Sequence, residues 1–506
     1  MLNLPDPSRP GSLFIERLSR DYGFISSHVS ALNPNGLPVG FAIDKRPLHY
    51  GDRAYLGITC AACHTRQLTF PRTLNGRDTA VWEIPVHGGP SLVDLPRFKQ
   101  DLYDAFFALL VDDGLVIRFG LGLLGHAPSA DEIKSLRGEI KEFTGPVALG
   151  RSLTIQWQIK PADFGPGNLN ALTQGNYNNV GLGAWLGLKG LSSPGSAAPL
   201  RPGFEGAVNY PPMWFAHGDT WAQWFAEIHH PGARNWVQSV SSSEVRPPKM
   251  IESQKAAVVL GSIHFENIAE IQHSLELLRT PKWPAQVFGT LDPLQVEKGR
   301  VLYQQQCAGC HTRRTLAPND LGIVFHDRTA FDVGTDPTAS VQFAEGGQRR
   351  VDDLKALAEK ILTMRRAQLQ PQGDDMAAHY MKLYSRGRPD DFAIAKDLYA
   401  NTGSASSIRS GAAYWTPPLE GIFATSPYLH NGSIRTLKDL LTAPTQRPKS
   451  FHTGSTEFDA SAVGLKNDGP FLYDTQDPGK GNGGHAFGTE LDIGEKAALI
   501  EYLKSL

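Results

Sequence analysis

The sequence predicts a mainly α-helical protein with little β-structure, divided into two domains at residues 1–285 and 286–506. Three observations support this prediction. The chain has 506 residues, which is more than one ordinary domain holds. Helix-capping residues precede apolar stripes at helical spacing in both halves. Each half also carries one copy of the same five-residue cysteine motif.

The cysteine motif accounts for all four cysteines, as CAACH at residues 60–64 and CAGCH at residues 307–311. C-x-x-C-H is the attachment pattern of haem c, in which each thiol adds to a vinyl group and the histidine binds the iron. The alternatives are structural disulfides, a thioredoxin-like pair, which does not require the histidines, and a zinc site, which leaves them unexplained. The sequence therefore predicts two covalently bound haem c groups, attached through Cys60, Cys63, Cys307 and Cys310, whose irons are bound by His64 and His311.

The first half is predicted to contain capped helices. Asp94 and Pro96 mark the start of one helix, and Ser129 with Glu132 forms a capping box at the start of another. The buried side of the first helix is expected to carry Phe98, Leu102, Ala105, Phe106 and Leu109.

A long loop insertion is predicted in the same domain. Residues 160–250 are rich in Gly, Pro, Asn and Trp and lack sustained periodicity. This composition predicts long ordered loops, with disorder as the alternative. Pro281, Trp283 and Pro284 mark the domain boundary, after a helix at about residues 268–278.

The second half is predicted to be a helical cytochrome c-like domain. Asp292 and Pro293 start a helix that leads into Cys307, and Asp492 with Glu495 caps the last helix of the chain. These two helices are expected to cross, as in a cytochrome c fold, with a further helix at residues 354–361 between them in sequence. The apolar stripe of the last helix is predicted to be Ile493, Ala497, Ile500 and Leu503.

Charge and hydropathy exclude two kinds of partner. Lys and Arg number 49 against 51 Asp and Glu, so no basic face is expected for nucleic acid. No apolar stretch has the length of a membrane span; the best, residues 108–125, is interrupted by charges and is predicted as a buried helix pair. Because haem is attached to such motifs outside the cytoplasm, we expect a periplasmic or secreted protein. The first residues lack the features of a signal peptide, which we expect to have been removed.

Several strings outside the cysteine motifs resemble the rubber-oxygenase-like group of dihaem cytochromes. In the first half they are NPNGLPVGF at residues 33–41, GIT at 57–59 and YPPMW at 210–214 followed by Trp221 and Trp224. In the second half they are PPLEGI at 417–422 and PYLHNGS at 427–433. The second-half strings also resemble bacterial dihaem cytochrome c peroxidases and the dihaem enzyme that matures methylamine dehydrogenase.

The resemblance implies two cytochrome c-like haem domains with unequal roles. The N-terminal haem would bind dioxygen in an apolar pocket, and the C-terminal haem, with two histidine ligands, would serve as an electron reservoir. A tryptophan between the haems would couple them. Two departures are a chain shorter than expected and His87 before two glycines, where the group suggests Asp.

The resemblance also indicates further site residues. His485 lies in a Gly-rich segment similar to the one that carries the sixth ligand, and it is predicted to bind the second haem opposite His311. His430 is the alternative ligand; otherwise it makes a structural hydrogen bond. Trp221 is predicted as the inter-haem tryptophan, with Trp236 and Trp224 as neighbours, although buried packing explains most tryptophans equally well. The string GTDP at residues 334–337 predicts a turn near the second haem, with a calcium site as the minor alternative.

Three classes of function stay open on these observations. The first is a dioxygenase that cleaves carbon–carbon double bonds in polyisoprene or a smaller alkene. The second is a peroxidase, which reduces hydrogen peroxide with electrons from a small donor protein. It needs a polar acid–base residue over the open iron. The third is an electron-transfer cytochrome with both irons fully ligated.

Overall fold

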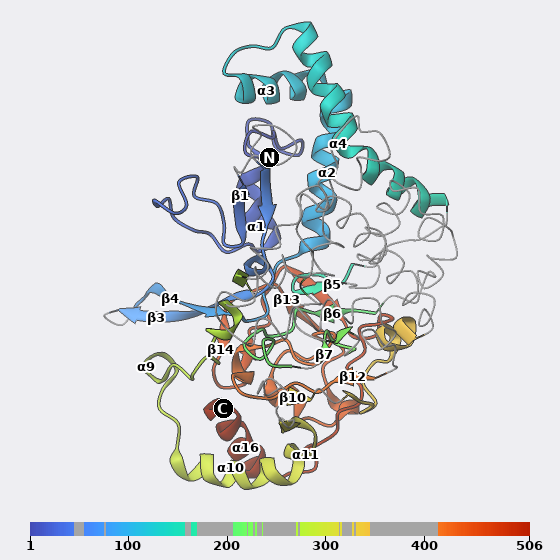
Figure 1. The fold of residues 1–506 in the computed structure, drawn as a ribbon. Helices are drawn as coiled ribbons and strands as arrows, with labels where there is room; N and C mark the ends of the chain where they lie inside the picture. The colour runs from blue at the N-terminus through green and yellow to red at the C-terminus, as the bar shows by residue number, and fades with distance from the viewer. Residues whose placement is uncertain are drawn as a thin grey trace, which may run out of the picture.

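The computed structural model shows helices and irregular segments arranged around several two-stranded sheets (Figure 1). The structure describes residues 1–44, 55–74, 77–156, 163–169, 206–219, 221–225, 228–229, 235, 270–271, 274–312, 314–315, 326–327, 330–344 and 413–506. Trp236, the helix predicted at residues 354–361 and most of the 160–250 insertion lie outside these residues. The predicted fold class, mainly α with two cytochrome c-like haem domains, stays a prediction.

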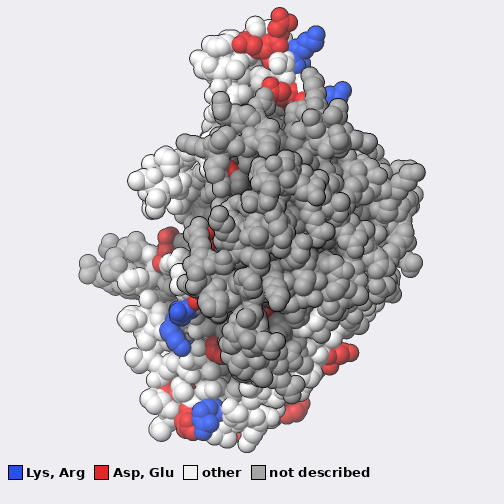
Figure 2. Space-filling view, in the orientation of Figure 1, with Lys and Arg blue, Asp and Glu red and all other residues white. Residues whose placement is uncertain are grey.

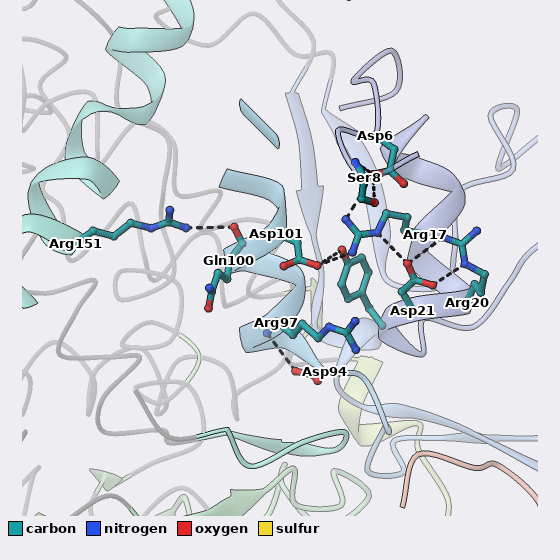
Figure 3. Close-up of polar contacts among 11 residues, drawn as sticks. Asp6, Ser8, Arg17, Arg20, Asp21, Asp94, Arg97, Gln100, Asp101 and Arg151 are labelled. Carbon is teal, nitrogen blue, oxygen red and sulfur yellow. Dashed lines mark hydrogen bonds and ion pairs between the residues drawn. The ribbon is translucent and has the colours of Figure 1, made fainter. Parts of the chain in front are cut away.

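The N-terminal segment is fastened to helix α2 (Leu95–Val111) by a network around one arginine of α1 (Arg17–Tyr22). Arg17 donates to Asp21 at 2.9 Å and to Asp101 of α2 at 2.6 Å, and Tyr22 also donates to Asp101 (Figure 3). Asp6 lies 3.8 Å from the same guanidinium. Because the Arg17 side chain is largely buried, the acids compensate a charge that would otherwise be costly.

Helices α2 and α4 (Ala130–Gln156) begin where their capping residues predict, with α3 (Asp113–Leu124) between them. Asp94 accepts from the backbone N–H of Arg97 at 3.1 Å, and Ser129 with Glu132 makes both bonds of a capping box.

The prediction of a buried helix pair at residues 108–125 is right about the helix break and half right about the burial, since Leu109, Val116 and Phe119 are buried. Asp112 ends α2 and caps α3, accepting from the N–H of Leu115 at 2.9 Å. However, Leu121 and Leu123 are 50% and 53% exposed. In the described part of the chain, α3 packs with one side on α2 and α4 and projects from the body (Figure 1).

A long antiparallel hairpin follows the first cysteine motif directly, and the sequence did not predict it. Strands β3 (Thr65–Leu74) and β4 (Arg77–His87) pair from Thr65 opposite His87. Leu68 is fully buried, whereas His87 is exposed at the end of β4. Thr69 forms a bridge with Glu457, so the hairpin connects the first cysteine motif to the C-terminal half.

One hydrophobic core draws on both sides of the predicted domain boundary. The residues that it takes from the first half include Leu68, Val86, Trp214 and Phe215, and from the second half Leu302, Tyr303, Phe423, Phe458, Leu499 and Leu503. Phe288 packs against this core at Phe458, and it also meets Phe70 of β3 edge-on, with ring centroids 5.0 Å apart. The boundary at residue 285 stays a prediction.

Helices α10 (Pro293–Gln306) and α16 (Ile493–Ser505) pack against each other, as the sequence predicts. Their caps are confirmed: Asp292 accepts from Leu294 N–H, and Asp492 forms a capping box with Glu495. The predicted stripe of α16 is half wrong, because Ile493 is 90% exposed and Ala497 is also exposed. The buried side instead carries Ala498, Leu499, Ile500 and Leu503, since α16 meets α10 at Gly299 rather than along its first turn.

The remaining described elements are short. The strands are β1 (Phe41–Asp44), β2 (Tyr55–Ile58), β5 (Asn168–Leu169), β6 (Val208–Asn209), β7 (Trp221–Ala222), β8 (Ile228–His229), β9 (Arg314–Thr315), β10 (His326–Asp327), β11 (Ala330–Phe331), β12 (Tyr414–Trp415), β13 (Ser450–Thr453), β14 (Phe458–Asp459), β15 (Gly464–Leu465) and β16 (Phe471–Asp474). The helices are α9 (Ala285–Phe288), α11 (Ala308–His311) and α15 (Leu437–Leu440), with 3₁₀ turns at Phe14–Glu16, Cys60–Ala62, Ile422–Ala424 and Pro444–Gln446.

Two surface properties follow from the described residues. None of their helices has the length and apolarity that crossing a membrane requires. On the face in Figure 2, described acidic and basic side chains lie beside one another at the α3–α4 end and at the opposite end near α10, without a large patch of one sign.

Candidate functional site

The second cysteine motif is presented at the end of helix α10. Cys307 ends α10, and the single turn of α11 carries Cys310 and His311. The Nδ1–H of His311 donates to the carbonyl of Pro417 at 2.7 Å. Because a carbonyl only accepts, this bond places the proton on Nδ1 and leaves Nε2 free for a metal. Burial lowers the pKa of His311, which keeps the imidazole neutral, as a ligand must be.

A second imidazole faces His311 across a cavity. The rings of His311 and His485 have centroids 6.2 Å apart, with their planes inclined by 56°. Metal–nitrogen bonds of about 2 Å on each side of one ion would separate two opposed ring centroids by about 6 Å. Burial, followed by the neighbouring His311, lowers the pKa of His485 to about 4. Its buried Nδ1 has no hydrogen-bond partner among the described residues. The two rings therefore have the spacing of opposed axial ligands.

The cavity between these rings has the lining that a haem requires. Cys307, Cys310, His311 and His485 all line it. Its wall is largely apolar and includes Leu437, Leu440, Leu441, Leu499 and Leu503. Two thiols, two opposed neutral imidazoles and an apolar wall are the donor set and surroundings of haem c. The residues present therefore fit the group.

His430, the alternative ligand, lines the same cavity in a different arrangement. Its ring stacks on Tyr414 with centroids 3.6 Å apart and planes inclined by 13°. Burial lowers the pKa of His430 to about 3. Its backbone carbonyl accepts from the N–H of Asn209 at 2.7 Å. Of the two candidates, His485 has the opposed geometry, and His430 packs flat against an aromatic ring.

The first cysteine motif has the same local construction. Cys60–Ala62 forms a 3₁₀ turn, and the Nδ1–H of His64 donates to the carbonyl of Pro211 at 3.0 Å. Tyr210 lies edge-on to His64 with centroids 6.1 Å apart. Cys60 is exposed, whereas burial raises the pKa of the Cys63 thiol to about 12. The described residues at His64 thus repeat the local arrangement of the second motif, and a haem bound at His64 stays a prediction.

The two proline carbonyls are functional groups that sequence reasoning missed. Pro211 and Pro417 are each the first residue of a Pro-Pro pair, in YPPM and TPPL. Each accepts from the Nδ1–H of the histidine of its own motif. A repeat search that paired each C-x-x-C-H with a later Pro-Pro would have found this signal. The carbonyl orients the ring and raises its basicity.

The segment at Asn209 connects the two sites. Its backbone carbonyl accepts from the Trp224 indole N–H at 2.7 Å, and its amide side chain donates to the carbonyl of Leu429 at 2.8 Å. Trp224 lines the cavity at His311, and Pro211 holds His64. Of the tryptophans described in residues 221–225, Trp224 lines this cavity and Trp221 does not. The inter-haem role of Trp221 stays a prediction, and Trp236 lies outside the described residues.

Residues 334–337 lie beside the cavity, which is lined by Thr335 and by the preceding Val333, and their place near a haem stays a prediction. Asp336 uses both carboxylate oxygens on backbone donors, accepting from Thr338 N–H at 2.9 Å and from Gly481 N–H at 2.8 Å. The calcium alternative stays a prediction.

The described residues give little support for the cysteines as disulfides, a thioredoxin-like redox pair or a zinc site. The four thiols are not joined in disulfides, and burial raises the pKa of Cys307 to about 11, unlike the lowered pKa of a redox-active thiol. In the part of the chain that the structure describes, no group of three or more His, Cys, Asp or Glu side chains is arranged to hold a metal ion.

Comparison with known proteins agrees with the geometry of the second site. Residues 413–452 match the family model described as RoxA-like, cytochrome c-like. This segment is therefore similar to RoxA-like cytochromes c. It includes Pro417 and His430, which lie at the cavity. A cytochrome c-like domain implies covalently bound haem c with iron, and it indicates a haem oxidoreductase.

Two curated relatives come from Sinorhizobium fredii (strain NBRC 101917 / NGR234), and both are named as uncharacterized. The protein y4iJ is 29% identical over 547 aligned residues, covering 97% of this chain and 85% of the relative. The protein y4iM is 26% identical over 277 residues, covering 53% of this chain and 52% of the relative. The similarity to y4iJ thus extends over nearly all of this chain.

Proposed function

We propose that this chain is an extracytoplasmic dihaem c-type oxidoreductase that uses dioxygen to cleave carbon–carbon double bonds. The reaction would take place at the N-terminal haem, with the C-terminal haem as an electron reservoir. The observation that carries the proposal is the opposed pair of His311 and His485. A haem held between two imidazoles does not readily accept a further ligand, so the reactive position is assigned to the site of His64.

The proposed reaction balances without an external reductant. An alkene and one dioxygen molecule give two carbonyl compounds, with one oxygen atom in each, as the double bond and the O–O bond break. The haem supplies an iron at which dioxygen is activated. The chain attaches and orients the group through Cys60, Cys63 and the Pro211-bound His64. The polymer polyisoprene and smaller alkenes are both substrates of the required chemistry.

The protein residues between the sites support electron exchange. His64 is bonded to the carbonyl of Pro211, and Asn209 is bonded to the indole of Trp224, which lines the second cavity. This route combines covalent steps with two short hydrogen bonds. It supports Trp224, the neighbour of the predicted Trp221, as a candidate for the coupling tryptophan.

The test uses the full-length, haem-loaded protein. Haem content is measured first, and the optical spectrum is then recorded in air, with dithionite, with hydrogen peroxide and with polyisoprene latex or a short oligoisoprenoid. Under ¹⁸O₂, the proposal predicts aldehyde and ketone products that each carry one labelled oxygen.

The other two classes give different results. A peroxidase would consume peroxide with electrons from a reduced small cytochrome and leave the alkene unchanged. An electron-transfer cytochrome would show two low-spin haems that cyanide and carbon monoxide do not alter. Either result would replace the oxygenase proposal.

A further inference from the structure

The segment that carries His485 has an unusual backbone. Gly484 has φ of 67° and His485 has φ of 44°, so two consecutive residues lie in the left-handed region. His485 is one of few described residues other than Gly with this geometry, which an L side chain adopts at an energetic cost. A Cβ on Gly484 would lie 2.2 Å from the carbonyl of Gly334, so the two segments are in tight contact. Something must hold the segment in this conformation.

Arg447 is the residue that holds it. Its guanidinium Nη1 donates to the carbonyls of Asn482 at 2.6 Å and Gly484 at 2.8 Å, and Nη2 donates to the carbonyl of His485 at 3.0 Å. The remaining bonds go to Leu440 and Thr442, on the α15 side. Every nitrogen of the side chain is therefore used, on backbone carbonyls alone.

The surroundings of Arg447 exclude solvent. The residue is 4% exposed, and burial lowers its pKa to about 10, so it is still charged at neutral pH. No ion pair joins Arg447 to a carboxylate of the described residues, and Asp439 acts on it as a nearby charge that raises its pKa against the larger effect of burial. A buried cation whose partners are carbonyls binds them strongly, because each carbonyl dipole compensates part of the charge. Lysine cannot match this planar set of donors.

The opposite side of the segment is held by residues 333–336. Asp336 accepts from Gly481 N–H at 2.8 Å, and the carbonyl of Val333 accepts from His485 N–H at 2.9 Å. His485 is thus held at its backbone N–H by the carbonyl of Val333 and at its own carbonyl by Arg447.

We propose that Arg447 is a positioning residue, supported by Asp336, that fixes His485 as the sixth ligand of the C-terminal haem and so keeps that iron closed to other ligands. This inference rests on the assignment of His485 in the proposed function. The physical basis is linkage: an added ligand competes only with molecules in which His485 has moved away, so its apparent affinity follows the fraction of that state. Loosening the segment raises this fraction.

The test compares variants of the full-length, haem-loaded protein. The variants are Arg447→Met, Arg447→Lys, Asp336→Asn and His485→Gly, with Arg435→Met as the control. Arg435 is a second arginine of the same region, which donates to the carbonyl of Leu465 and lies 3.7 Å from Asp439. Each variant is analysed for haem content, for the low-spin signal of the ferric protein and for the apparent affinity for imidazole.

Arg447→Met is expected to bind imidazole about tenfold more tightly and to gain a high-spin fraction at one haem. Arg447→Lys and Asp336→Asn should shift in the same direction by less, and Arg435→Met should not shift. Asp336 is half-buried, so its variant also answers the question if Arg447→Met does not fold. Folded Arg447 and Asp336 variants with two haems and an unchanged low-spin signal would overturn the inference.

The His485→Gly variant distinguishes a wrong positioning role of Arg447 from a wrong assignment of His485 as the ligand. If it loses the low-spin signal while the Arg447 variants keep theirs, the positioning role is wrong and the ligand assignment stands. If His485→Gly keeps the signal, the ligand assignment of the proposed function is wrong, and the inference falls with it. Absence of alkene cleavage with the expected spectra leaves the positioning role in place.

Discussion

Replacing Gly299 by Ala tests how closely α10 and α16 must approach. A Cβ at this position would lie 2.0 Å from the carbonyl oxygen of Ala498 and 2.7 Å from the Cβ of Tyr502. Carbon–oxygen contacts normally stay beyond about 3.3 Å, so the helices would have to separate by about 1 Å. Overpacking of this kind costs about 1–3 kcal/mol, and the better helix propensity of Ala returns about 1 kcal/mol at most.

We therefore expect Gly299→Ala to lower the free energy of unfolding by about 1 kcal/mol, the middle of the overpacking range less the gain in helix propensity. For a domain of the size predicted for residues 286–506, that corresponds to a decrease in Tm of about 2–4 °C. The measurement is guanidinium-induced unfolding of the haem-loaded protein, followed by Soret absorbance, with a thermal scan beside it. The low-spin signal should also weaken before global unfolding, because α10 ends at Cys307.

The matched control is Gly138→Ala in the middle of α4. Gly138 is exposed, and a Cβ there would meet nothing within 4 Å. Only helix propensity changes, so the control should be more stable than the wild type by about 0.5–1 kcal/mol. If Gly299→Ala behaves like Gly138→Ala, the close crossing of α10 and α16 is not the feature that holds this domain together.

The remaining predictions concern a buried acid, a buried phenol and the second motif. Burial raises the pKa of Asp94 to about 6 from its usual 3.8. This shift lowers the free energy of unfolding by about 3 kcal/mol above pH 6, where the buried carboxyl is charged, and has no effect below pH 3.8. Asp94→Asn keeps the helix cap but removes the buried charge, so the variant should resist urea better than the wild type at pH 7.5 and equally well at pH 3.5. An equal difference at both pH values would contradict this. Tyr414→Phe should lower the free energy of unfolding by about 1–3 kcal/mol. The lost hydroxyl donates to the Asp336 carbonyl at 2.8 Å and accepts from the Ser340 N–H at 3.1 Å. Chemical denaturation checks it, and an unchanged midpoint would count against it. Replacing Cys307 and Cys310 by Ala should leave one covalently bound haem, as read from the intact mass; retention of two would disprove the attachment.

Local signals predicted much of the secondary structure. The starts of α2, α4, α10 and α16 follow from capping residues that act within one turn, such as Asp492 with Glu495. The β3–β4 hairpin was missed, because its residues do not alternate cleanly and its stability comes from contacts such as Phe70 with Phe288. The buried face of α16 was half wrong for a similar reason. The approach of Gly299 to Ala498 decides which side is covered, and the two lie far apart in sequence.

The chemistry of haem attachment is determined by the sequence alone, because C-x-x-C-H acts through the spacing of neighbouring side chains. The choice of the groups that complete each site belongs to the tertiary structure. His311 is separated by 106 residues from the carbonyl of Pro417, and His64 by 147 from that of Pro211. The facing ring of His485 and the guanidinium of Arg447 are likewise brought in by folding. Such pairs form only when distant segments pack together, and no local pattern of residues specifies which segments will meet.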